Sequence, residues 1–221
     1  MSNGTVSVDA LVPKDMALKA EAVGVAKAGL GAYRMFALAI LAGAFIAMGA
    51  NYATTVWAGL GKIVVSAGKE VAFTTGLPYG IQRLLGGLVF ATGLIMVVVG
   101  GSELFTGNCL IPMAWADKKV TTGAMLRNWV IVYLGNFVGS VVTAYFVFLG
   151  KQHLFGGGAV GLAALNIGIA KTSLGFVQCV FLAIFCNALV CMAVALLQCP
   201  EHHRQDPLDH PADLGLRGVR V

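Results

Sequence analysis

Long apolar runs alternate with short charged segments along this chain. The uncharged runs extend over Met35 to Gly61, Leu84 to Ser102, Asn128 to Gly150 and Thr172 to Pro200. A helix that crosses the hydrocarbon core of a bilayer needs about 20 predominantly apolar residues. The pattern therefore predicts an all-α polytopic membrane protein with about four spans in a lipid bilayer.

The second apolar run is interrupted near its end. Residues 100–108 read G-G-S-E-L-F-T-G-N, and another apolar stretch from Cys109 to Ala116 follows at once. That stretch is too short to cross alone, so we expect a helix that breaks near mid-membrane and then resumes. Irregular backbone at this depth is tolerated only where protein buries it or a watery cavity faces it, and transporters bind ions at such breaks. A re-entrant kink without a role in transport is the alternative.

Glu103 is the only acidic residue embedded between apolar stretches. A charge inside a membrane is costly, which makes this residue a functional candidate by default. It can equally serve structure alone, by accepting hydrogen bonds from amides freed at the break. Both interpretations stay open at this point.

The N-terminal segment has a different pattern from the apolar runs. Leu18, Ala22, Val25 and Leu30 recur at helix-like spacing among charged residues. This pattern predicts an amphipathic arm that lies at the membrane surface or packs against a partner. The resulting division of the chain is an arm over 1–34, a transmembrane domain over 35–198 with spans at about 35–60, 80–101 continued at 107–116, 128–150 and 172–198, and a polar tail over 199–221.

Glycine recurs at short intervals in two of the predicted spans. The second holds Gly86, Gly93 and Gly100, and the third holds Gly135 and Gly139. Small residues at such spacing let helix backbones approach closely in lipid. We therefore expect close-packed helices and an oligomer.

Composition and charge support a membrane location. The sequence is 58% hydrophobic and 11% charged, and its net charge is +5. Ten Lys and Arg residues fall in the N-terminal arm, the loop after residue 116 and the tail, against five in the opposite loops. This asymmetry predicts a cytoplasmic N-terminus in the cytoplasmic (inner) membrane. The arm has no short apolar core with a cleavage site, so we expect no removable signal peptide.

The same composition argues against several classes of protein. The basic residues form no stripe with interleaved aromatics, so nucleic acid binding is not expected. Four of the five cysteines lie in or at the end of the fourth span without C-x-x-C spacing, which favours packing in a reducing setting. No convergent titratable residues or metal-ligand spacing occur in the spans, so we expect neither an enzyme nor a cofactor.

Three motifs in order resemble the formate/nitrite transporter family. They are G-G-S-E-L-F-T-G-N at the break, R-N-W-V-I-V-Y-L-G-N-F-V-G from Arg127, and C-N-A-L-V-C-M-A-V from Cys186. The resemblance runs from about Val12 to Gln198. It implies an aquaporin-like helix bundle of two inverted repeats, a homo-pentamer with one pore in each protomer, and a small monovalent anion such as formate, nitrite or hydrosulfide as substrate.

The resemblance also implies roles for individual residues. An apolar pore constriction is implied at Phe90, Leu94 and Val190. A mobile loop at the break is implied at Leu104, Phe105 and Thr106, with the Thr106 hydroxyl offered to an anion. A basic residue near the outer mouth is implied at Lys171, and a polar position in the pore at Asn187. Stripping an anion of water is costly, so passage through apolar rings needs central donors or protonation of the anion to the neutral acid.

The chain departs from the family pattern in its C-terminal part. The family's central histidine, in a G-F-E-H-like motif, has no counterpart, and the sequence turns polar after Gln198 without a fifth or sixth span. Codons compatible with residues 199–221, read from their second base, permit an apolar helix. A genuine cytoplasmic tail is one explanation of these residues, and a shifted reading frame is another. We hypothesise a frameshift near residue 199, an incomplete bundle and a product that conducts little. An uninterrupted genomic match to the sequence would contradict the frameshift.

Two alternatives to an anion channel stay open. A channel for neutral solutes such as water or glycerol would normally carry two N-P-A repeats, and this chain has none. A membrane assembly subunit without its own substrate is the other alternative.

Overall fold

The computed structural model of the chain describes residues 13–59, 61–65, 71–75 and 77–197. Four of its helices are long and apolar enough to cross a membrane, which confirms the predicted helical architecture with about four spans. The predicted tail over 199–221 lies outside the described residues. The elements in order are α1 (Pro13–Ala28), α2 (Ala32–Gly59), β1 (Gly61–Val65), β2 (Val71–Thr75), α3 (Tyr79–Val99), η1 (Gly107–Leu110), α4 (Ile111–Ala116), α5 (Thr122–Leu149), η2 (Gln152–Leu154), α6 (Ala159–Thr172) and α7 (Phe176–Leu197).

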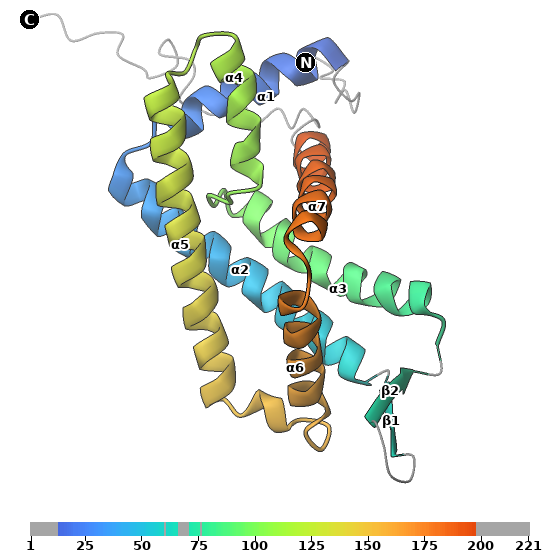
Figure 1. The fold of residues 1–221 in the computed structure, drawn as a ribbon. Coiled ribbons are helices and arrows are strands. Elements are labelled where there is room, and N and C mark those ends of the chain that lie inside the picture. Colours follow the sequence, from blue (N-terminus) through green and yellow to red (C-terminus); the bar gives the residue numbers. More distant parts are fainter. Residues whose placement is uncertain (1–12, 60, 66–70, 76, 198–221) are drawn as a thin grey trace, which may run out of the picture.

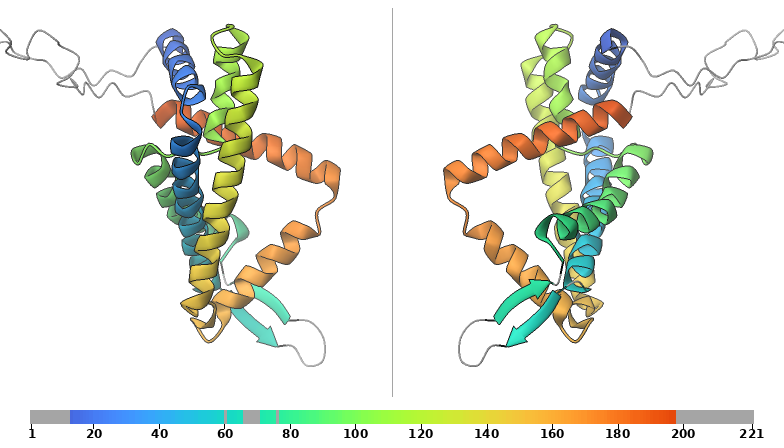
Figure 2. Two further views of the ribbon diagram at one scale, coloured as in Figure 1. Left: turned by 90° about the vertical axis from the view of Figure 1, so that its left-hand side faces the viewer. Right: turned by 90° about the vertical axis from the view of Figure 1, so that its right-hand side faces the viewer.

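The centre of the bundle is the pair α2 and α5, which lie side by side (Figures 1 and 2). Glycine allows this approach, because a Cβ on Gly43 would overlap the carbonyl of Asn136 and a Cβ on Gly139 would overlap the carbonyl of Ile40. Met35 and Ala39 of α2 and Val132 of α5 are fully buried in the same interface. The backbones of the two helices are thus in direct contact.

The first half of the broken span, α3, packs on another part of α2. Gly49 and Gly93 face each other there, and a Cβ on Gly93 would lie 2.9 Å from the carbonyl oxygen of Phe45. Gly86 makes room for the indole of Trp57, whose Nε1 donates to the carbonyl of Gln82 at 2.9 Å. The glycine pattern of the second span therefore serves packing of α3 on α2.

Two elements were not expected from the sequence. The antiparallel hairpin β1–β2 follows α2, with Gly61 opposite Thr75 and Val65 opposite Val71. The short helix α6 lies between the third and fourth predicted spans, and its 14 residues are too few for a span. Neither element replaces a predicted span, so both add to the helical bundle without changing its class.

The third span begins earlier as a helix than the uncharged run suggested. Thr121 is the N-cap of α5, and its hydroxyl accepts a hydrogen bond from the amide of Ala124 at 3.2 Å. Arg127, which bounded the predicted span at residue 128, lies inside the helix. The bounds of the lipid-embedded part of α5 stay a prediction.

The N-terminal helix α1 packs on α4 through its small residues. Ala20 and Ala28 are buried, and a Cβ on Gly24 would lie 3.3 Å from the Cα of Ile111. The predicted apolar stripe is on another face, since Leu18 and Val25 are exposed. Contact of that stripe with a membrane surface or a partner stays a prediction.

The last two helices form a V that leaves the bundle and returns to it (Figure 2). Helix α6 packs on α2, and the far end of α7 returns to η1. Most side chains of α7 are exposed, including Phe176, Phe181 and Phe185. Its uniformly apolar surface is typical of a helix whose surroundings are lipid or other helices.

Candidate functional site

The break in the second span begins with a helix C-terminus that the sequence explains. Gly101 has a φ of +60° in the left-handed region, where glycine is favoured. The amide of Gly101 donates to the carbonyl of Val98 at 3.2 Å, and the amide of Ser102 donates to the carbonyl of Val97 at 3.1 Å. These two bonds are the Schellman arrangement that ends many helices. The G-G-S sequence therefore stops α3 inside an apolar run.

The loop after the break is held by one side chain from α5. Asn136 Nδ2 donates to the carbonyls of Ala39 at 2.8 Å and Glu103 at 2.9 Å, while its Oδ1 accepts from the amide of Phe105 at 2.9 Å. The amide of Glu103 also donates to the carbonyl of Leu38 at 3.3 Å. Backbone groups exposed by a broken helix are thus paired inside the protein, as hydrocarbon surroundings require.

A buried polar cluster lies beside this loop. Lys27 Nζ of α1 and Glu103 Oε1 are 2.9 Å apart, and Asn108 Nδ2 of η1 donates to Glu103 Oε2 at 2.8 Å. Asn108 Nδ2 also donates to Asn128 Oδ1 of α5 at 2.8 Å, and Asn128 Nδ2 donates to the carbonyl of Lys27 at 3.2 Å. The cluster therefore joins the N-terminal helix, the break and α5.

Burial makes this cluster electrostatically demanding. Asn108 and Asn128 are 0% exposed and Glu103 is 3% exposed. A buried carboxylate is tolerated when an opposite charge and hydrogen-bond donors surround it. The partners of the Glu103 carboxylate are side chains. The purely structural role considered for Glu103 in the sequence analysis expected it to accept hydrogen bonds from backbone amides freed at the break.

The three loop residues after Glu103 point to different neighbours. Phe105 packs edge-to-face on Trp129 and Tyr133 of α5, with ring centroids 6.2 and 5.7 Å away. Leu104 lines a small cavity of about 160 Å³ together with Lys27, Glu103 and other residues. Thr106 is half-buried, and its carbonyl lies 3.3 Å from the thiol of Cys191 on α7.

Helix α7 carries the predicted polar and apolar positions. Asn187 and Val190 are half-buried. The Oδ1 atom of Asn187 is buried and has no hydrogen-bond partner within the described part of the chain. A buried amide with an unused acceptor is available to a polar solute.

The other two predicted constriction residues lie on α3. Phe90 is 37% exposed and Leu94 is half-buried. Helix α7 packs mainly on η1, so the described elements do not form an extensive contact between α3 and α7. Phe90 and Leu94 are therefore not joined to Val190 by such an interface.

A basic vestibule lies near the end of the bundle that carries the hairpin. Its cavity of about 640 Å³ is lined by Lys171, Arg83, Trp57, Tyr79 and other residues. The Arg83 guanidinium lies 5.0 Å from the ring of Trp57 and 4.8 Å from that of Tyr79. Cation–π contacts of this kind hold a guanidinium in place while it keeps its charge.

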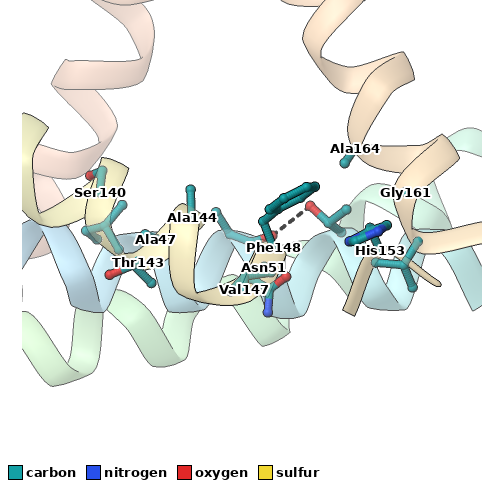
Figure 3. Close-up of a pocket in the computed structure, with 14 residues that line it drawn as sticks. Ala47, Asn51, Ser140, Thr143, Ala144, Val147, Phe148, His153, Gly161 and Ala164 are labelled. Carbon is teal, nitrogen blue, oxygen red and sulfur yellow. Dashed lines mark hydrogen bonds between the residues drawn. The ribbon is translucent and has the colours of Figure 1, made fainter. Parts of the chain in front are cut away.

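A third cavity of about 480 Å³ lies between α2, α5 and α6. Figure 3 shows Ser140, Thr143 and Ala144 at one side of it and His153 with Gly161 and Ala164 at the other. His153 stacks on Phe148 with ring centroids 5.0 Å apart. This cavity is mostly apolar and is separate from the helix break.

An ion cluster outside the spans, with exposed Lys119 and Asp117 and buried Glu21, ties α1 to the connection between α4 and α5. Lys119 Nζ lies 2.8 Å from Glu21 Oε1 and 2.9 Å from Asp117 Oδ2. The hydrogen bond with Lys119 lowers the pKa of Asp117, and the hydrogen bond with Glu21 raises the pKa of Lys119. No group of three or more His, Cys, Asp or Glu residues suited to a metal ion occurs among the residues that the structure places.

Several residues of this site were missed in the sequence. Asn128 and Asn136 stand inside an otherwise apolar run, and an uncharged amide at such a position was a signal for a buried hydrogen-bonding role. The sequence alone shows Lys27 and Arg83 only as charged residues that flank apolar runs. Glu103 and Trp57, with which they interact, are distant in the sequence, so no local pattern indicates these contacts.

Comparisons with known proteins bear on this arrangement. A model of the family described as formate/nitrite transporter matches residues 14–203. The chain is 36% identical over 186 residues to a protein from Escherichia coli strain K12 named formate channel FocA. The matched segment covers 84% of this chain and 60% of that protein. It is also 36% identical over 192 residues to a protein of the same name from Haemophilus influenzae, covering 87% of this chain and 63% of that protein.

A solved structure has a similar fold. It is described as a pentameric formate channel with formate bound, and it matches with a TM-score of 0.61 and 32% sequence identity over 77% of this chain and 66% of that one. The chain spans 60% and 63% of the lengths of the two relatives named above.

Proposed function

Because this chain belongs to the formate/nitrite transporter family, we propose that it carries formate or a similar small monovalent anion, such as nitrite or hydrosulfide, across a membrane. The observation that carries the proposal is the helix break, whose backbone is paired by Asn136 and flanked by the buried Lys27–Glu103 ion pair. Discontinuous helices held by protein in this way are where transport proteins place solute sites. A membrane enzyme has no comparable support among these contacts.

The vestibule supports an anion as the solute. Lys171 and Arg83 place two cations beside one cavity, and positive charge at a cavity mouth raises the local concentration of anions. Stacking on Trp57 and Tyr79 restrains Arg83, so the charge is oriented before a solute arrives. The vestibule is thus a place where an anion could first bind.

We propose that other residues select the solute. Phe90, Leu94 and Val190 form the proposed apolar constriction, which excludes hydrated ions because their water must be removed. Thr106 and Asn187 supply the proposed polar contacts beside it, and Leu104 and Phe105 belong to the loop at the break. Packing of Phe105 on Trp129 and Tyr133 means that motion of this loop would have to disrupt an aromatic cluster.

The proposed setting is the cytoplasmic (inner) membrane, with the N-terminus in the cytoplasm and five copies in one assembly. The pentamer is supported by the similar solved structure. The orientation is supported by the excess of basic residues at the end that holds α1 and the α4–α5 connection.

The test is formate flux into proteoliposomes that contain the purified 221-residue chain. We expect uptake that is slow, in line with the low conduction hypothesised from the sequence, but above that of protein-free liposomes. Lys171→Gln should slow uptake at low ionic strength and have little effect at high salt, because screening removes the attraction. Lys151→Gln is the matched control, since Lys151 is an exposed lysine outside this vestibule.

Other outcomes separate the alternatives. Water or glycerol permeability without formate, nitrite or hydrosulfide uptake would favour a channel for neutral solutes. Stable insertion and binding to an intact relative without any uptake would favour an assembly subunit. Either result would contradict anion transport by this chain.

A further inference from the structure

Two cysteine thiols meet at the helix break. Cys109 belongs to η1, directly after the loop, and Cys191 belongs to α7. Cys109 Sγ lies 3.6 Å from the carbonyl oxygen of Phe105, and Cys191 Sγ lies 3.3 Å from the carbonyl oxygen of Thr106. The two thiols therefore donate to consecutive carbonyls of one loop, although they come from distant parts of the sequence.

The two thiols also share one stretch of backbone. Phe105 and Thr106, whose carbonyl oxygens they contact, are neighbours in the chain. Both residues are half-buried and both are free thiols. By contrast, Cys179 and Cys186 lie on the exposed surface of α7. Proximity and partial access thus single out one pair among the described cysteines.

We propose that Cys109 and Cys191 form a redox-sensitive dithiol whose oxidation by a hydroperoxide produces a disulfide that ties α7 to the helix break. A disulfide requires the two side chains to approach with little backbone movement, and thiols held at neighbouring carbonyls of one loop are placed for that approach. The site would take small neutral oxidants such as hydrogen peroxide.

The chemistry balances in two steps. The sulfur of one cysteine, after losing its proton, attacks one peroxide oxygen, and the O–O bond breaks to give a sulfenic acid and a hydroxide that takes up the proton as water. The sulfur of the second cysteine then attacks the sulfenic sulfur, and the S–O bond breaks with loss of a second water. Two thiols are oxidised to one disulfide, and one peroxide is reduced to two waters.

Oxidation would change how the loop is held. Both S–H donors disappear, so the carbonyls of Phe105 and Thr106 lose hydrogen bonds that are individually weak. A covalent link from η1 to α7 replaces them, and this link fixes the position of α7 beside Thr106. The effect on passage of a solute rests on the function proposed above, whereas formation of the disulfide does not.

The experiment uses the full chain in detergent and in liposomes, treated with hydrogen peroxide and then denatured with a maleimide polymer that adds mass to each free thiol. We expect the oxidised chain to lose two of its five thiols without forming dimers, and dithiothreitol to restore them. Peptide mass spectrometry should find residues 109 and 191 in one cross-linked pair. Hydrogen exchange of the backbone over residues 104–110 should slow on oxidation.

Variants make the test specific. Cys109→Ser and Cys191→Ser should each abolish the loss of the thiol pair, with Cys109→Ala and Cys191→Ala as second variants where serine disturbs folding. Cys179→Ser is the matched control on α7 and should still form the link. Retention of all thiols, links only between chains, or unchanged exchange at the loop would overturn the proposal.

Flux measurements separate this proposal from the proposed function. If formate passes through the reduced chain, oxidation should slow it severalfold, and unchanged flux in the linked chain would overturn a role in passage. If neither form transports formate while the link still forms and slows exchange, the proposed function fails and the dithiol site stands.

Discussion

The Lys27–Glu103 ion pair shows how much one residue at the break depends on its partners. Glu103 is almost fully buried, so its charge is stable only while Lys27 and Asn108 remain in place. Removing one member of a buried pair strands the other charge, whereas removing both does not. Stability at this site is therefore a property of the pair.

Substitution of Lys27 by methionine should lower the free energy of unfolding by about 3–5 kcal/mol, because the Glu103 carboxylate loses its counter-charge. The double variant Lys27→Met/Glu103→Gln should recover much of that loss, since the remaining amide can still accept from Asn108. Thermal unfolding in detergent, followed by circular dichroism, measures both effects. Equal destabilisation in the single and double variants would show that the ion pair is not the cause.

The residue scale is also where sequence reasoning reached least far. The break itself was predictable, because G-G-S-E interrupts an apolar run. Its partners were not, because Lys27, Asn108, Asn128 and Asn136 lie on three different elements. Only tertiary packing brings their side chains together, and a single sequence records no such contacts.

At the scale of elements, the contact between α2 and α5 depends on the absence of side chains. A Cβ at residue 139 would overlap the Ile40 carbonyl, and backbone atoms have little freedom to move away. Gly123 of the same helix has nothing within 4 Å of an added Cβ. Residues 123 and 139 are thus both glycines of α5, but only residue 139 is packed closely against another helix.

The substitution Gly139→Ala should destabilise the chain by roughly 1–3 kcal/mol, because it forces α2 and α5 apart. In a matched experiment, Gly123→Ala should be neutral or slightly stabilising, since alanine is a better helix former than glycine. Unfolding midpoints of the two variants in the same detergent provide the comparison. Similar midpoints would mean that the interface adjusts without cost.

The contact of α1 with α4 and the following connection is held partly by exposed charges, and its pH dependence follows from two groups. The pKa of Asp117 lies below its ordinary value of 3.8. The contribution of Asp117 to the stability of the contact is therefore present above pH 3.8 and is lost as the pH falls through the lowered pKa. The pKa of Lys119 lies above its ordinary value of 10.5. The contribution of Lys119 to the stability of the contact is therefore present below pH 10.5 and is lost as the pH rises through the raised pKa. The contact should therefore be unchanged across neutral pH.

Hydrogen exchange of α1 amides, corrected for intrinsic rates, tests this stability. Protection should stay constant from about pH 5 to about pH 9 in the parent chain, because neither group changes charge there. Lys119→Met should increase exchange in α1 at low salt and less at high salt. Lys118→Met is the control, and an equal effect there would remove the special role of Lys119.

The element scale also shows why the sequence predicted the spans but not their neighbours. Length and hydropathy indicate a spanning helix directly, and the four predicted spans have counterparts in α2, α3, α5 and α7. Helix α6 is apolar but short, so length excluded it. The segment between the first two spans has no span-length apolar run, and its pairing into a hairpin requires a partner strand that composition does not reveal.

At the scale of the whole molecule, the two ends of the bundle differ in charge and in structure. Helix α1 and the α4–α5 connection lie at one end, and the hairpin and η2 lie at the other (Figure 1). The end that holds α1 carries the larger share of Lys and Arg. An orientation in a membrane can therefore be tested with one probe at each end.

In a background without native cysteines, Leu154→Cys should react with a membrane-impermeant maleimide added outside intact cells, because η2 is predicted to face outward. Gly123→Cys, at the start of α5, should react only after the membrane is permeabilised, since that end of the bundle is predicted to face the cytoplasm. Both residues are exposed in the described structure. The reverse labelling pattern would show the opposite orientation.

Asn136 also imposes an order of events during synthesis. A ribosome makes the broken helix before it makes α5, yet the amide of Phe105 and the carbonyl of Glu103 find their partner only on α5. Until that helix is present, these groups need water or another protein as a temporary partner, because lipid offers none. The break can thus take its final position only after the third long helix has been inserted.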